Sequence, residues 1–206
     1  MAAPSGPETR PADFFSFLGL PRKLRIDMND LEQRYRALSR QFHPDYFYNA
    51  SPAERRASLE RSSYLNDAYR TLKSPAGRVE YLLKLEGLEA SGDGKTGSRG
   101  GAPPAGLLEE VFALNEELDE IREMRASGIA EEEWRGRLER ARQPIESKRQ
   151  EHETQLAALS SSWDSAVDAN VGESERKPIL EALHERFLER NYISNLLTTI
   201  ERELGS

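Results

Sequence analysis

A proline at position 44 interrupts two helical patterns, and this interruption constrains the fold more than any other feature. Apolar residues recur at helical spacing before and after it: Leu31, Tyr35, Leu38 and Phe42 upstream, and Leu65, Ala68, Tyr69 and Leu72 downstream. Pro44 removes a backbone donor and disfavours helical geometry at His43, so the first helix must stop near Phe42. The sequence predicts a helical hairpin whose bend carries His43, Pro44 and Asp45.

The bend presents two chemically useful side chains on a stiff turn. Asp45 offers a carboxylate that can pair with an arginine of a partner, and His43 offers both a donor and an acceptor. Because the turn is rigid, little conformational entropy is lost when a partner docks. We interpret the bend as a docking site; the alternative is that His43 and Asp45 only cap helix ends.

The helix before the bend has a basic outer face. Gln33, Arg36 and Arg40 point away from the apolar stripe, and Arg34 lies toward its side. The whole chain has a net charge of -7, so a basic face here favours an acidic groove on a partner. The alternative is an ordinary solvated helix face.

Composition excludes several classes of site. Charged residues make up 32% and hydrophobic residues 37% of the 206 residues, so the core must be built from narrow helical stripes. No apolar run approaches the roughly 20 residues that cross a bilayer, and no secretory signal peptide is visible, so we expect no membrane association. There is no cysteine, and the three histidines are far apart, so we expect neither a metal site nor a cofactor.

The chain divides into four segments, all without strand-like alternation. We expect a disordered N-terminus (1–11), a helical domain (12–88), a flexible Gly-rich linker (89–104) and a helical bundle (105–206). Within the linker, Gly-Asp-Gly-Lys-Thr-Gly lacks phosphate-loop spacing. The bundle should contain three antiparallel helices, at about 105–126, 131–159 (bent at Pro144) and 174–204, so the fold class is all-α.

The first bundle helix carries more apolar surface than one stripe explains. Its inward stripe is Leu107, Val111, Leu114, Leu118 and Ile121. Leu108 and Phe112 lie about a third of a turn away and are adjacent to each other. Tyr192 belongs to neither apolar stripe of the last helix. These side chains predict an exposed apolar patch that binds a partner; the alternative is a wide core that buries them.

Several runs together resemble the HscB-type J-domain co-chaperones of iron–sulfur cluster assembly. They are Phe14 to Pro21, Tyr35 to Phe47, Leu65 to Leu72, Arg78 to Leu83 and Leu114 to Ile121. Other J-domain proteins share only the first hairpin. The resemblance implies an N-terminal J-domain hairpin and a C-terminal three-helix bundle in an L-shaped arrangement.

The resemblance also implies partners for the two surfaces. His43, Pro44, Asp45, Gln33, Arg36 and Arg40 would bind a DnaK/HscA-type chaperone and stimulate its ATPase. Leu108, Phe112 and Tyr192, with Leu107 and Val111 at the edge, would bind the scaffold protein IscU. Glu109 departs from the apolar residue that many relatives carry there.

The resemblance leaves three other functions to compare. The first is a J-domain co-chaperone for another client. The second, an enzyme using His43 and Asp45, is disfavoured because no third orienting group or enclosing pocket is signalled. Nucleic-acid binding is disfavoured because no basic run interleaves with aromatic residues. We expect a cytoplasmic protein, or alternatively one of the mitochondrial matrix.

Overall fold

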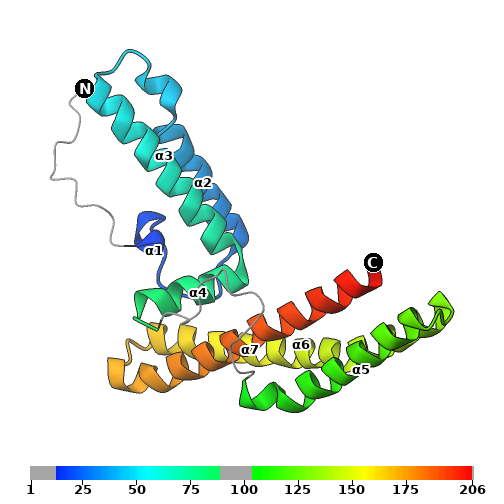
Figure 1. Ribbon diagram of the computed structural model, residues 1–206. Coiled ribbons are helices and arrows are strands. Elements are labelled where there is room, and N and C mark those ends of the chain that lie inside the picture. Colours follow the sequence, from blue (N-terminus) through cyan, green and yellow to red (C-terminus); the bar gives the residue numbers. More distant parts are fainter. Residues whose placement is uncertain (1–12, 89–103, 206) are drawn as a thin grey trace. The chain divides into compact units, whose positions relative to one another are not determined.

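The computed structural model describes residues 13–88 and 104–205, and these residues form helices joined by short turns (Figure 1). No strand occurs within the described residues, so the all-α class is confirmed. The predicted disordered N-terminus (1–11) lies outside the described residues. So does the predicted linker (89–104), apart from Pro104.

The first part of the chain is built around two paired helices. Helix α1 spans Phe14–Phe17, α2 spans Met28–Gln41, and α3 spans Pro52–Lys73. Helices α2 and α3 lie antiparallel and side by side, with the short 3-10 helix η1 (Pro44–Phe47) at the bend between them (Figure 1). Helix α4 (Pro75–Leu85) follows α3 directly.

Polar caps fix the ends of these helices. The Asp27 carboxylate accepts the Asn29 backbone N–H at 2.8 Å and starts α2. Ser51 and Glu54 form a capping box at the start of α3, with Pro52 in the first turn. Ser74 ends α3 and caps α4.

Both predicted stripes of the hairpin are confirmed as its core. The fully buried members of this cluster are Phe15, Leu18, Leu31, Leu65, Ala68 and Leu72. Tyr35, Leu38, Phe42 and Tyr69 pack partly buried against them. The Tyr35 and Tyr69 rings stack with centroids 4.2 Å apart, which ties α2 to α3.

Three longer helices follow. Helix α5 spans Leu108–Ala126 after the 3-10 turn η2 (Ala105–Leu107), α6 spans Glu131–Asp168, and α7 spans Glu173–Gly205. Helix α6 continues past Pro144 and ends at Asp168, so the predicted end near Leu159 was wrong. The predicted bounds of the other two helices agree with the structure to within a few residues.

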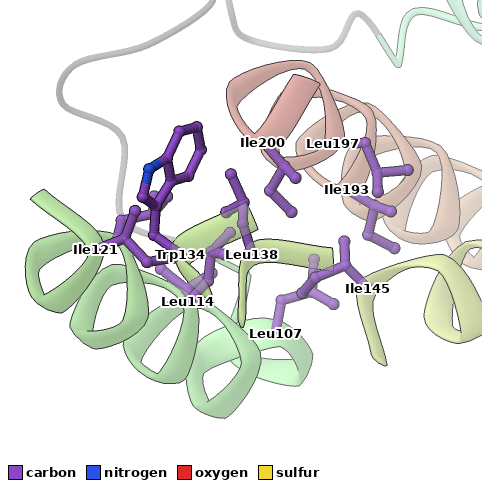
Figure 2. Close-up of a cluster of buried hydrophobic side chains, with 11 residues drawn as sticks. Leu107, Leu114, Ile121, Trp134, Leu138, Ile145, Ile193, Leu197 and Ile200 are labelled. Atoms are coloured by element: carbon purple, nitrogen blue, oxygen red, sulfur yellow. The ribbon is translucent and has the colours of Figure 1, made fainter. Parts of the chain in front are cut away.

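The side chains between α5, α6 and α7 form a second core (Figure 2). Helix α5 contributes the whole predicted inward stripe, Leu107, Val111, Leu114, Leu118 and Ile121, all buried. Trp134, Leu138 and Ile145 of α6 meet Ile193, Leu197 and Ile200 of α7. The core is thus shared by three helices, as the periodicity predicted.

Contacts divide the chain into two compact units that do not follow the sequence order. Of the described residues, the first unit contains 13–87 together with 160–176. The second contains residue 88, 104–159 and 177–205. The end of α6 and the start of α7 therefore belong with the hairpin.

Candidate functional site

The turn at His43 begins where α2 ends. The Phe42 N–H donates to the Leu38 carbonyl at 2.9 Å and closes α2, and η1 starts at Pro44. The His43 Nδ1 accepts the Asp45 backbone N–H at 3.3 Å and so caps η1. This bond leaves Nε2 as the donor of the neutral ring.

Two serines fix the turn to α3. The Ser58 and Ser62 hydroxyls both donate to the Phe42 carbonyl, each at 2.8 Å. The pair satisfies a carbonyl at the end of α2 that has no helical partner. These serines were not predicted from the sequence. The feature that could have indicated their role is their spacing of four residues on α3, next to the predicted bend.

Both side chains of the turn are exposed. The His43 side chain is 50% exposed and the Asp45 side chain 86%. Asp45 Oδ2 lies 3.5 Å from His43 Nδ1, which makes an ion pair only when the ring is protonated, and a pair this exposed contributes little to stability. The carboxylate and the imidazole therefore remain accessible to a partner on a turn of fixed geometry.

The predicted basic face of α2 is also exposed. Gln33, Arg36 and Arg40 all lie on the solvent side, and Arg36 pairs with Glu32 one turn earlier at 2.6 Å. Arg34 instead lies to the side and donates to the Leu18 and Gly19 carbonyls. Arg34 thus supports the fold, while the other three residues form a face next to the turn.

A second exposed surface lies on α5. Phe112 is 67% exposed and Leu108 is 39% exposed, one turn apart on the same face. Leu107 and Val111 are 1% and 7% exposed and lie in the core of the bundle. The structure therefore places Leu107 and Val111 beneath the surface, because they belong to the inward stripe.

Helix α7 contributes apolar side chains of its own. Tyr192 is half-buried and packs against the bundle core, and Leu188, one turn before it, is 38% exposed. Leu196, one turn after Tyr192, is also partly buried there. Because Leu188, Tyr192 and Leu196 are spaced four residues apart, they share one face of α7. Of the three, only Tyr192 was predicted from the sequence as a site residue.

The start of α5 comes close to this part of α7. A Cβ added to Gly106 would lie 3.0 Å from Oε1 of Glu189, and Gly106 is two residues before Leu108. Glu189 follows Leu188 directly. This approach brings the first turn of α5 next to the α7 segment that carries Leu188 and Tyr192, although no direct contact between Tyr192 and Leu108 or Phe112 is observed.

The described residues offer neither a metal-binding cluster nor a membrane-spanning helix. No group of three or more His, Asp or Glu side chains in residues 13–88 and 104–205 is placed to hold a metal ion. Among the helices described, none is both long and apolar enough to cross a membrane. The exposed turn and the exposed apolar side chains of the bundle are the candidate sites.

Known proteins resemble this chain both in sequence and in fold. Residues 13–81 match the DnaJ domain family. The chaperone HscB from Vibrio cholerae is similar over 93% of this chain and 96% of its own, with 27% identity and a TM-score of 0.60. The crystal structure of the human co-chaperone protein HscB is similar over 98% of this chain and 85% of its own, with 28% identity and a TM-score of 0.59.

The hairpin, its His-Pro-Asp turn and the DnaJ match define a J-domain protein. Such proteins act through a partner ATPase of the DnaK type. The similarity continues through α5, α6 and α7, which the DnaJ match does not include. Over most of its length the chain is accordingly similar to the HscB-type J-domain co-chaperones, which are regulators and not enzymes.

Proposed function

We propose that this co-chaperone brings the iron–sulfur scaffold protein IscU to a DnaK/HscA-type chaperone and stimulates ATP hydrolysis there, which aids cluster maturation or transfer. The J-domain (12–88) would contact the chaperone and the bundle (105–206) would hold the client. We expect the protein in the cytoplasm, or alternatively in the mitochondrial matrix.

The geometry of the turn is the observation that carries this proposal. His43 and Asp45 project from a short helix whose position is fixed by Ser58 and Ser62. Arg36 and Arg40 extend the same surface along α2 with positive charge. An acidic groove with an arginine at one end would match both features, since the arginine can take the Asp45 carboxylate.

The bundle supports the second half of the proposal. Phe112 and Leu108 expose apolar area that the fold does not use, and Leu188 does the same on α7. Large exposed apolar side chains mark partner surfaces when they lie together. A client held here has a raised effective concentration at the chaperone, because one chain carries both contacts.

Substitutions at the turn test the chaperone contact. His43→Gln or Asp45→Asn should abolish stimulation of the chaperone's ATP turnover and leave scaffold affinity unchanged. Asp67→Asn is a matched control, because Asp67 is an exposed acid of the same hairpin away from the turn. Loss of both activities in the turn variants would contradict two separate sites.

Substitutions on the bundle test the client contact. A Leu108→Ala, Phe112→Ala, Tyr192→Ala variant should lose IscU in a calorimetric titration and keep its basal ATPase stimulation. Since Tyr192 also packs against the core, Leu108→Ser with Phe112→Ser provides a second variant that changes only exposed side chains. Unchanged IscU affinity in both would refute the assignment.

The alternative is a co-chaperone for a different client, and Glu109 is the observation that favours it. This exposed carboxylate lies between Leu108 and Phe112 in sequence, where the family resemblance implies an apolar residue. A wild-type protein that stimulates the chaperone but does not bind IscU would support this alternative.

A further inference from the structure

Three large apolar side chains are strongly exposed at the bend of the hairpin. Tyr46 is 74% exposed, Tyr48 is 78% exposed, and Leu59 of α3 is 57% exposed. We call these three residues the tip cluster. The proposed roles of the turn and of the bundle use none of them.

The local sequence explains why the two tyrosines point outward. Phe47, between them, is half-buried, so the run Tyr46-Phe47-Tyr48 turns one ring inward and two rings toward solvent. Neither tyrosine is needed to build the core. Their exposed rings cost solubility without contributing packing, which is the usual mark of a contact surface.

Leu59 belongs to the same end of the hairpin. Its neighbour Ser58 donates to the Phe42 carbonyl at 2.8 Å, which places this turn of α3 beside the start of the bend. Asn66, seven residues later and hence on the same helix face as Leu59, accepts from the Tyr35 hydroxyl of α2 at 2.9 Å. Leu59 therefore lies on the side of α3 that is turned toward α2.

Tyr46 of the tip cluster is in contact with the turn. The Tyr46 ring lies edge-on to the His43 ring, with centroids 6.1 Å apart. A partner that takes the Asp45 carboxylate would therefore also meet Tyr46. Tyrosines that are presented this way are typical of the few residues that dominate binding energy at interfaces.

We propose that Tyr46, Tyr48 and Leu59 form a second, apolar contact for the same DnaK-type chaperone. This inference rests on the proposed function. The tip cluster would occupy an apolar depression on the chaperone beside the groove that takes Asp45. The tip cluster would set the affinity for the chaperone, whereas His43 and Asp45 would trigger ATP hydrolysis by the chaperone.

The test uses the full chain and measures the chaperone's ATP turnover against co-chaperone concentration. Tyr48→Ser with Leu59→Ser should raise the half-saturating concentration by about tenfold or more and leave the maximal stimulation unchanged. The effect should persist at high salt, because an apolar contact is not screened, whereas the effect of Arg40→Gln should fade. Tyr46→Ser is measured separately, since it also removes a neighbour of His43.

Two controls separate surface chemistry from folding. Tyr46→Phe with Tyr48→Phe retains the apolar area and should give a half-saturating concentration close to that of the wild type. Ile129→Ser removes an exposed apolar side chain from the other compact unit and should leave the chaperone response unchanged. Thermal melting by circular dichroism should be the same for every variant.

The outcomes are distinct. An unchanged half-saturating concentration in the Tyr48/Leu59 variant overturns the tip cluster, provided that His43→Gln still abolishes stimulation. Normal stimulation by His43→Gln overturns the proposed function itself. If sedimentation shows that wild-type dimers dissociate in the Tyr48/Leu59 variant at unchanged half-saturation, the tip cluster is a self-association contact and the inference is wrong.

Discussion

His152 shows how a residue can be buried for electrostatic reasons that no periodicity reveals. Its side chain is 2% exposed, and its Nδ1 lies 3.3 Å from Oε2 of the buried Glu189. Arg186 also pairs with Glu189, at 2.5 Å. From the sequence, the three histidines were considered only as possible metal ligands, because the partner of His152 is on another helix and a single sequence cannot indicate it.

The pH dependence of stability should reveal this histidine. Burial lowers the pKa of His152, and the positive charges of Arg186 and Lys148 add to this effect, while Glu189 and Glu151 oppose it. A lowered pKa means that the unfolded state binds the proton more tightly, so the free energy of unfolding should fall as pH drops below about 6.5.

A pair of histidine variants isolates this effect. Urea denaturation followed by circular dichroism at pH 7.5 and 5.5 should show a smaller loss of stability for His152→Gln than for the wild type. His43→Gln removes a half-exposed histidine and should behave as the wild type does. Equal pH dependence in all three proteins would contradict a destabilising protonation of His152.

At the scale of elements, the helices were largely predictable, but the end of α6 was not. The predicted end near Leu159 precedes three consecutive serines, which have modest helix propensity. The helix nevertheless continues, because Trp163 is completely buried and its indole N–H donates to the Arg22 carbonyl at 2.8 Å. Tertiary burial thus outweighs local propensity here, and this contact joins residues too distant in sequence to be foreseen.

Asp164 provides a test of this extended end of α6. Its carboxylate accepts the Leu24 and Arg25 backbone N–H groups at 2.7 and 2.9 Å, and its charge opposes the desolvation that lowers the pKa of buried Arg78. Asp164→Asn should lower the free energy of unfolding by about 1.5–3 kcal/mol, the usual range for hydrogen bonds to a charged group.

Asp168 is the matched control for this substitution. It lies one turn further along α6 and pairs with Lys23, but its side chain is 64% exposed. Asp168→Asn should therefore change stability by less than about 1 kcal/mol. Equal effects of the two substitutions in urea denaturation would show that the Asp164 hydrogen bonds contribute no more stability than the exposed Asp168 ion pair.

At the scale of the whole molecule, the sequence predicts two consecutive domains, whereas contacts cluster differently. Residues 160–176 group with the hairpin, although they are some seventy residues further along the chain. Composition marked the Gly-rich segment at 89–104 as a boundary, but composition carries no information about which distant segment returns to pack. The exposure of the turn and of two side chains on α5 was predictable from the His-Pro-Asp tripeptide and from the off-stripe spacing of Leu108 and Phe112.

A fragment ending at Leu88 should therefore be less stable than the same residues in the full chain. It lacks the Trp163 and Asp164 bonds to Arg22, Leu24 and Arg25. Hydrogen exchange of the Leu24 and Arg25 amides should be faster in the fragment, and Trp163→Ala in the full chain should reproduce part of that change. Identical exchange rates would show that the stability of the hairpin does not depend on residues 160–176.

The chain contains two tryptophans, and each compact unit holds one of them. Trp163 is in the unit with the hairpin, and Trp134 is in the other, where the Arg125 guanidinium covers its ring at 3.8 Å. Trp134→Phe and Trp163→Phe would each leave a single intrinsic fluorophore. Their emission would report melting of one half of the protein at a time, without an added dye, and would show whether the halves melt together.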